Sequence, residues 1–212
     1  MSEVITSACV LSNQSYGLLL AENGGGYSAW RGWALTRWHP DPSLPQPGSL
    51  LFLRDRETGE FWSNQSARLQ SAADHLLQEW SAQGLDVTCR IAVAADADME
   101  VRTIRITNRG AGPRKVELTT YAEICLNTAA ADAAHPAFSK LFVQTDYDAA
   151  RGALLASRRL RSPDDQPLWV GQCLRGGEDI SWDTDRERFI GRTRSLWFPQ
   201  ALDSPAPLAG NL

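Results

Sequence analysis

The chain lacks the features of a membrane-spanning or nucleic-acid-binding protein. None of its hydrophobic stretches approaches the roughly 18 residues that a transmembrane helix needs. Basic residues are not in excess, because 21 Lys and Arg stand against 25 Asp and Glu, for a formal net charge of −4. The short hydrophobic stretches predict that no segment spans a membrane. Since phosphate binding requires a basic surface, we also expect no nucleic-acid partner.

Cysteine and histidine are too few and too scattered to predict a metal site. The four cysteines, at positions 9, 89, 125 and 173, form no C-x-x-C pair, and the three histidines are isolated at 39, 75 and 135. We therefore expect no metal and no other cofactor. Cys89 and Cys125 lie within apolar or mixed patterns, where a thiol acts as a small hydrophobic side chain. Cysteines used in this way are typical of a reducing compartment and predict a cytoplasmic location.

The sequence also lacks the common catalytic motifs. It contains no G-x-S-x-G and no H-E-x-x-H. Neighbouring carboxylates occur at Asp164-Asp165, Glu178-Asp179 and Asp183/Asp185, all in polar turn-like stretches. Glycoside hydrolysis needs two carboxyl groups about 5–10 Å apart across a cleft, and adjacent solvated turn residues do not provide that arrangement. We expect these groups to promote solubility, and no catalytic residue in this chain.

What the sequence does contain is a period of two. Residues 87–93 (VTCRIAV) and 116–126 (VELTTYAEICL) alternate in the manner of half-buried strands. The stretch EVRTIRITNRGAGPRKVEL, residues 100–118, predicts a strand, a turn and a second strand, with the reversal at Asn108, Gly110, Gly112 and Pro113. Further strands are expected at residues 16–22, 50–54, 60–63, 75–80, 141–146, 153–158, 168–174 and 188–192, and helical turns only at 66–73 and 128–134. Residues 39–48, with four prolines, predict a loop. This pattern predicts an all-β fold, an antiparallel sandwich forming one domain over residues 1–212.

One stretch concentrates the unusual residues: NGGGYSAWRGWALTRWHPDP, residues 23–42. Its glycines predict a tight turn after a strand. Aromatic faces suit the apolar C–H faces of sugar rings, and arginine suits the hydroxyl rim. The alternative is that the tryptophans belong to the core and the arginines lie over them. The candidate carbohydrate-binding or interface residues here are Tyr27, Ser28, Trp30, Arg31, Arg37 and Trp38.

A second candidate stretch is AADAAHPAFSKLF, residues 130–142. His135 precedes Pro136, which favours an extended conformation within a long connection. His135 and Asp132 could form an acid–base pair. The alternative is ordinary loop packing with Phe138 as the anchor. His135 is therefore a further, weaker candidate for the carbohydrate-binding or interface surface.

Several segments resemble family 94 glycoside hydrolases, which include cellobiose and chitobiose phosphorylases and the phosphorylase-like part of cyclic β-1,2-glucan synthases (formerly glycosyltransferase family 36). They are SNQSYGLLLAENGGGYSAWRGWALTRW, LFLRDRETGEFWS, EVRTIRITNRGAGPRKVELTTYAEICL, AADAAHPAFSKLFVQT and DRERFIGRTRSL, the last three closest to the glucan-synthase branch. The resemblance implies the N-terminal two-sheet, galactose-mutarotase-like supersandwich. It further implies a catalytic (α/α)₆ barrel, which is absent here. The family sandwich also normally runs longer than 212 residues, so we expect the sandwich to be truncated.

Two functional hypotheses follow. In the first, the chain is a non-catalytic, carbohydrate-associated β-sandwich of a cyclic β-glucan synthase or disaccharide-phosphorylase-like transferase, which supports the barrel and contributes to binding a β-glucan or gluco-oligosaccharide. In the second, it is a structural scaffold that packs against the barrel or dimerises without touching sugar. An independent mutarotase-type enzyme would need a His/Glu pair inside a concave sheet, and we disfavour it.

Overall fold

The computed structural model describes residues 8–21, 25–38, 48–160, 162 and 166–212. These residues form two compact units, one with the described residues up to Gly32 together with Thr36–Glu123, the other with Trp33–Leu35 and Ile124–Leu212. Of the expectations above, the loop at residues 39–48 falls almost entirely outside the described residues, as do Asp164 and Asp165.

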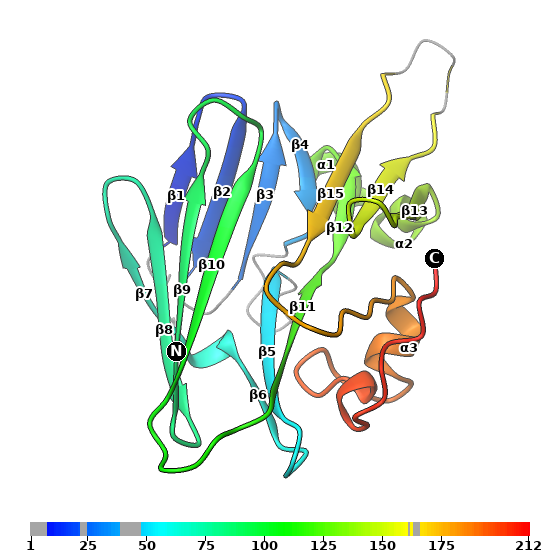
Figure 1. The fold of residues 1–212 in the computed structure, drawn as a ribbon. Helices are drawn as coiled ribbons and strands as arrows, with labels where there is room; N and C mark the ends of the chain where they lie inside the picture. Colours follow the sequence, from blue (N-terminus) through cyan, green and yellow to red (C-terminus); the bar gives the residue numbers. More distant parts are fainter. Residues whose placement is uncertain (1–7, 22–24, 39–47, 161, 163–165) are drawn as a thin grey trace, which may run out of the picture. The chain divides into compact units, whose positions relative to one another are not determined.

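The first unit is built from antiparallel strands in three runs of hydrogen-bonded neighbours, β1-β2-β3, β10-β9-β8-β7 and β11-β5-β6. Figure 1 shows β7–β10 running beside β1–β3. The strands are β1 Ala8–Ser12, β2 Tyr16–Ala21, β3 Gly26–Trp30, β5 Ser49–Asp55, β6 Phe61–Ser63, β7 Arg68–Ser71, β8 Leu76–Ala82, β9 Leu85–Val93, β10 Glu100–Asn108 and β11 Val116–Ala122, with a 3₁₀ turn η1 at Asn64–Ser66.

The core of this unit lies between its sheets. Alternate residues of β2, β5, β8 and β9 point inward, as a period of two requires. The fully buried members include Leu18, Leu53, Leu76, Val87 and Ile91, each exposing 2% or less of its surface. The predicted all-β antiparallel fold is therefore confirmed.

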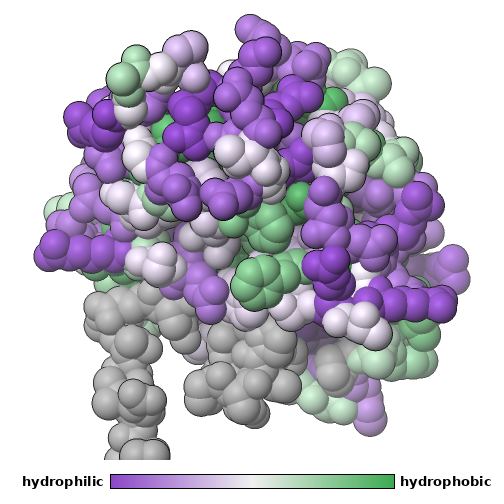
Figure 2. All heavy atoms as spheres, turned by 90° about the horizontal axis from the view of Figure 1, so that it is seen from below, coloured by the Kyte–Doolittle hydropathy of each residue, from purple (hydrophilic) through white to green (hydrophobic). Residues whose placement is uncertain are grey.

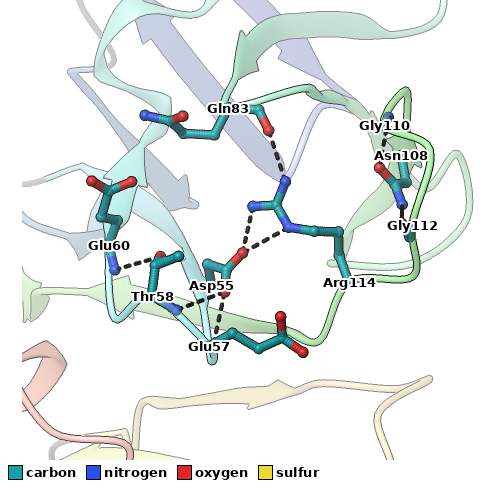
Figure 3. Close-up of polar contacts among 9 residues, drawn as sticks. All are labelled: Asp55, Glu57, Thr58, Glu60, Gln83, Asn108, Gly110, Gly112 and Arg114. Carbon is teal, nitrogen blue, oxygen red and sulfur yellow. Dashed lines mark hydrogen bonds and ion pairs between the residues drawn. The ribbon is translucent and has the colours of Figure 1, made fainter.

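A polar cluster joins three turns at one end of the first unit (Figure 3). The Asp55 carboxylate accepts hydrogen bonds from the backbone N–H groups of Glu57 (2.7 Å) and Thr58 (3.1 Å), and from Arg114 Nε (2.7 Å). Arg114 Nη1 in turn donates to the Gln83 carbonyl at 2.8 Å. The backbone N–H of Thr58, then that of Glu57, and then Arg114 lower the pKa of Asp55 below its ordinary value.

The predicted turn after β10 is confirmed beside this cluster. The Asn108 side chain accepts from Gly110 N (2.9 Å) and donates to Gly112 O (2.7 Å), so it closes the turn on itself (Figure 3).

The second unit holds β4 Trp33–Thr36, whose last residue belongs to the first unit, and β12 Ile124–Asn127. It continues with α1 Ala129–Ala134, α2 Pro136–Lys140, β13 Val143–Asp148, β14 Ala153–Arg158, β15 Trp169–Cys173, α3 Arg186–Ile190 and η2 Gln200–Leu202. Strands β13, β14 and β15 form an antiparallel sheet in that order. One face of this sheet is covered, because Tyr147 stacks on Trp182 at 4.6 Å between ring centroids.

Three local predictions were wrong. Residues 66–73 form the end of η1 and then strand β7, because Arg68–Ser71 pairs with β8 and that ladder outweighs local helix propensity. Residues 188–192 lie mostly in helix α3, which is capped by the Asp185 side chain at its start and ended by Gly191 with φ 87°. The expected single strand over 116–126 is interrupted at Glu123.

Other local predictions were confirmed. Residues 128–134 form α1 behind the cap of Thr128. Strands β2 and β3 are antiparallel and Ala21 N donates to Gly25 O at 2.8 Å, so the chain reverses between them, although Asn23 and Gly24 of the predicted turn lie outside the described residues. Strands β1, β3 and β4 were not predicted.

Most of the face drawn in Figure 2 is hydrophilic, and apolar residues gather in a smaller group near its middle.

Candidate functional site

Strand β3 presents the candidate residues on two opposite faces. Because side chains alternate along a strand, Tyr27 and Ala29 point to one face, and Ser28 and Trp30 point to the other. The burial of β3 agrees, with Ser28 buried at 5% exposure and Tyr27 only half-buried. The residues that the sequence groups into one surface thus divide into two sets.

The outward set is aromatic. Tyr27 stacks on Trp38, with ring centroids 6.0 Å apart and ring planes 11° from parallel, and both side chains are half-buried. Tyr27 lies opposite Leu19 of β2, which lies opposite Val10 of β1, a residue that is 64% exposed. We call Val10, Leu19, Tyr27 and Trp38 the outer strip. It is an apolar row across three strands that ends in a pair of stacked rings.

The inward set is held by Glu100 at the start of β10. The Ser28 hydroxyl donates to Glu100 Oε2 at 2.8 Å, and the Tyr16 hydroxyl donates to the same oxygen at 3.1 Å. Arg102 binds the other oxygen through Nε and Nη2, both at 2.8 Å. Burial works to raise the pKa of Glu100, but the charge of Arg102 and the hydrogen bonds from Ser28, Arg102 and Tyr16 outweigh it and lower that pKa. Burial, followed by the charge of Glu100, raises the pKa of Tyr16.

Trp30 is fixed at the turn between β9 and β10. Its Nε1 donates to one oxygen of Asp98, and the Ser15 hydroxyl donates to the other. The hydrogen bond from Ser15, and then that from Trp30, lower the pKa of Asp98. The exposed Arg31 places its guanidinium 4.9 Å from the centroid of the Trp30 ring. Trp30 therefore has its polar edge bound by Asp98 and a face close to Arg31.

Arg37 forms a buried ion pair. Its Nη1 lies 2.8 Å from Glu123 Oε1, with side chains only 2% and 8% exposed, and its backbone N–H donates to the Glu123 carbonyl at 2.8 Å. The Tyr121 hydroxyl binds the second oxygen of Glu123 at 3.3 Å. Removing one partner of such a pair leaves the other charge buried, so this contact fixes Arg37 and the chain leading into Trp38.

His135 belongs to the second unit. It is exposed at the junction of α1 and α2, where its carbonyl accepts from Ser139 N at 2.9 Å. Asp132 is buried at 5% exposure, so the two members of the suggested acid–base pair lie in different environments. Nearby, the Ser139 hydroxyl accepts hydrogen bonds from Asn127 (3.1 Å) and from Arg158 (3.3 Å).

The described residues show neither a metal site nor a membrane-spanning helix. Those residues contain no cluster of three or more His, Cys, Asp or Glu side chains placed to hold a metal ion. Within that part of the chain, no helix has both the length and the apolar character needed to cross a membrane. The thiols of Cys89 and Cys125 are buried at 0% and 1% exposure, and burial raises the pKa of Cys89 to about 11.

The sequence reasoning missed Asp98, Glu100 and Glu123, the carboxylates that hold the candidates. A signal was present for Glu100 alone. Glu100 and Arg102 share the inward face of β10 with Ile104 and Ile106, whereas Glu123 falls on the polar side of the alternation over 116–126 and gives no such signal. A charged residue on an apolar face indicates a buried partner elsewhere in the fold.

These features define an antiparallel β-sandwich domain with an aromatic strip on one outer face and with partly or fully buried carboxylates paired with arginine. The chain belongs to the glycosyl hydrolase 94 supersandwich domain family, whose family model matches residues 5–212.

Curated relatives are much longer than this chain. It is 34% identical over 214 residues to the cyclic beta-(1,2)-glucan synthase NdvB of Rhizobium meliloti (strain 1021), an alignment that covers 95% of this chain and 8% of the relative. It is 24% and 22% identical to the N,N'-diacetylchitobiose phosphorylases of Vibrio furnissii and Vibrio proteolyticus, with 91% of this chain and 25% of each relative covered. The chain thus spans a quarter or less of the length of these relatives.

Proposed function

We propose that this supersandwich domain is a non-catalytic part of a larger glucan-processing enzyme, in which it supports the catalytic part and contributes a surface for gluco-oligosaccharide. The relatives named for cyclic β-1,2-glucan synthesis and for chitobiose phosphorolysis support the carbohydrate class. The cytoplasmic location expected from the sequence is part of this proposal and rests on cysteine usage.

The observation that carries the proposal is the stacked pair at the end of the outer strip. Tyr27 and Trp38 are half-buried rather than sealed, and they lie next to Leu19 on the face of β3 that points away from Glu100. Flat aromatic groups of this kind suit the C–H face of a sugar ring. Ser28, Trp30, Arg31 and Arg37 then act as supports, because their side chains contact Glu100, Asp98, Trp30 and Glu123 respectively.

The carboxylates near this surface are engaged in the fold. Arg102 neutralises Glu100 and Arg37 neutralises Glu123, and both acids also accept hydrogen bonds from hydroxyl groups. A general acid needs a proton to donate near neutral pH, whereas a paired carboxylate stays ionised. This arrangement supports a binding or supporting role over acid–base chemistry at these positions.

The proposal is tested by titrating linear β-1,2-gluco-oligosaccharides against the chain while following tryptophan fluorescence and amide and indole resonances. We expect Tyr27→Ala and Trp38→Ala each to weaken binding about tenfold, because each removes a stacking ring. Met99→Ala, an exposed apolar residue (49%) on the β9–β10 turn, is the matched control and should leave the affinity unchanged. Unshifted resonances and constant fluorescence at millimolar sugar would count against direct binding.

A second candidate function is a structural scaffold that packs against the rest of a longer chain or against a second copy. The observation in its favour is that the outer strip is apolar and only partly covered, with Val10 64% exposed. A neighbouring domain or a second copy could cover that strip. In this case Trp30→Ala and Trp38→Ala should reduce the yield and assembly of the longer enzyme, while the sugar affinity stays the same.

A further inference from the structure

We propose that the exposed face of the β13–β14–β15 sheet, centred on Trp169, is a second saccharide-contacting surface that binds one pyranose ring of a gluco-oligosaccharide. The class of ligand rests on the proposed function above, but the residues and the unit are different. Trp169 is 57% exposed, an unusual position for the largest side chain.

The strand register places hydrogen-bonding groups beside the indole. Trp169 lies opposite Ser157 of β14, and Ser157 lies opposite Gln144 of β13, so these three side chains form one row on the same face. Directly opposed side chains on neighbouring strands are about 5 Å apart, which is the scale of a sugar ring. A ring stacked on Trp169 would therefore have a hydroxyl and an amide within reach of its own hydroxyl groups.

The adjacent row leaves room for the ring. Gly171 lies opposite Leu155, which lies opposite Asp146. A Cβ atom added at Gly171 would come within 3.2 Å of Leu155 Cδ2, so the Leu155 side chain leans over the glycine. Because Gly171 has no side chain, the surface beside Trp169 is recessed. Leu155 forms the apolar base of this recess, and the carboxylate of Asp146 lies at its edge.

This face is open to solvent, whereas the opposite face of the same sheet is covered. Gln144, Asp146 and Gly171 are exposed together with Trp169. On the opposite face, Tyr147 stacks on Trp182, and the Thr145 hydroxyl lies 3.0 Å from that of Thr184. The sheet is thus anchored from behind and presents a rigid platform in front.

The chemistry of the face favours a neutral polyhydroxyl ligand over other occupants. Among the described residues, the three strands contribute Asp146 and Asp148 to this face and no cation, and Asp148 is bound by Arg151 at 2.7 Å. An anionic ligand such as phosphate or nucleic acid would be repelled. Trp169 and Leu155 are the large apolar side chains on it, which is too few for the apolar core of a stable protein interface.

The test follows the indole N–H resonances of the 212-residue chain during titration with a linear β-1,2-gluco-oligosaccharide. The chain has eight tryptophans, so the signals can be assigned by single substitutions such as Trp169→Phe. We expect the Trp169 signal to shift and saturate, and Trp169→Ala to raise the Kd of this face about tenfold. Gln144→Ala, which removes one rim group without touching the indole, should raise the same Kd severalfold.

Two controls separate binding from general effects. Phe198→Ala removes another exposed aromatic group (63%) of the same unit and should leave the Trp169 titration unchanged. Glycerol at the same hydroxyl concentration should not shift the Trp169 signal, and an equal shift with glycerol would overturn the proposal.

The outcomes also separate this inference from the proposed function. A Trp169 signal that stays in place while the Trp38 signal moves overturns the inference and supports the outer strip. A Trp169 signal that moves alone supports the inference and removes the outer strip from the proposed function. If both signals stay in place at millimolar sugar, both proposals are wrong.

Discussion

At the scale of single residues, Glu100 contributes most to the arrangement around β3. It is a partly buried carboxylate that links β10 to Tyr16 of β2 and Ser28 of β3 and is balanced by Arg102. Hydrogen bonds to a charged group contribute more than neutral ones, and leaving a charge buried without its partner is costly. Three groups thus depend on one carboxylate.

We predict that Glu100→Gln lowers the free energy of unfolding by about 2 kcal/mol, because Arg102 loses its counter-charge while the shape of the site is kept. Urea denaturation measures the loss. Glu60→Gln is the matched control, since Glu60 is exposed and its substitution should cost little.

The loss should depend on pH in a defined direction. Since the folded-state pKa of Glu100 lies below its ordinary value of 4.5, the ionised group stabilises the fold above pH 4.5. That contribution is lost as pH falls through the folded-state pKa, so the difference between parent and variant should shrink below pH 4.5. A difference that stays constant from pH 7 to pH 3 would show that the charge of Glu100 is not the cause.

At the scale of elements, the pairing of β2 with β3 depends on Gly26. Its φ of 154° is rare for residues with a side chain, and a Cβ atom there would lie 2.1 Å from the Leu19 carbonyl oxygen. The two backbones approach so closely that only glycine fits. The position of Tyr27, and hence of the outer strip, follows from that close approach.

Gly26→Ala should therefore destabilise the chain by more than about 2 kcal/mol and increase amide exchange in β2 and β3. Gly84→Ala separates the two causes, because Gly84 also has a positive φ (77°) but nothing lies within 4 Å of an added Cβ. We expect about 1 kcal/mol for this control. Equal losses for both variants would mean that backbone conformation, rather than the clash with Leu19, decides the effect.

Strands with a regular alternation could be predicted from the sequence, whereas short elements and a strand bounded by glycines could not. Strands β9 and β10 have nine residues each and a clear period of two. Strand β3 was hidden, because five residues between glycines at 26 and 32 read as a turn rich in aromatic residues. Helix α3 has only five residues, too few for a helical period to appear.

At the scale of the whole molecule, the candidate site could be predicted only in part. Tyr27 and Trp38 were named from the sequence, and they stack on each other. That Ser28 and Trp30 face the other way was not foreseen, since their partners Glu100 and Asp98 lie 72 and 68 positions away along the chain. Pairings at such a distance follow from the packing of sheets rather than from local pattern.

The two compact units lead to a further prediction. Each has its own strands, and Glu100 lies in the first. We expect hydrogen exchange in Glu100→Gln to speed up in β8–β10, while the amides of β13–β15 keep the rates of the parent chain, because local stability differs between cooperative units. Equal acceleration everywhere would mean that the two units open together.

Because Tyr27 and Ser28 point to opposite faces of β3, the number of residues in the strand decides which face each side chain reaches. Inserting one residue into the strand would turn the tyrosine toward Glu100 and the serine toward solvent, whereas inserting two would return each to its own side. We therefore expect related chains to vary freely in length outside this strand, and within it to differ only by an even number of residues. A graft of the aromatic pair onto another scaffold must therefore first keep the strand length unchanged, or change it by an even number of residues, before side chains are matched.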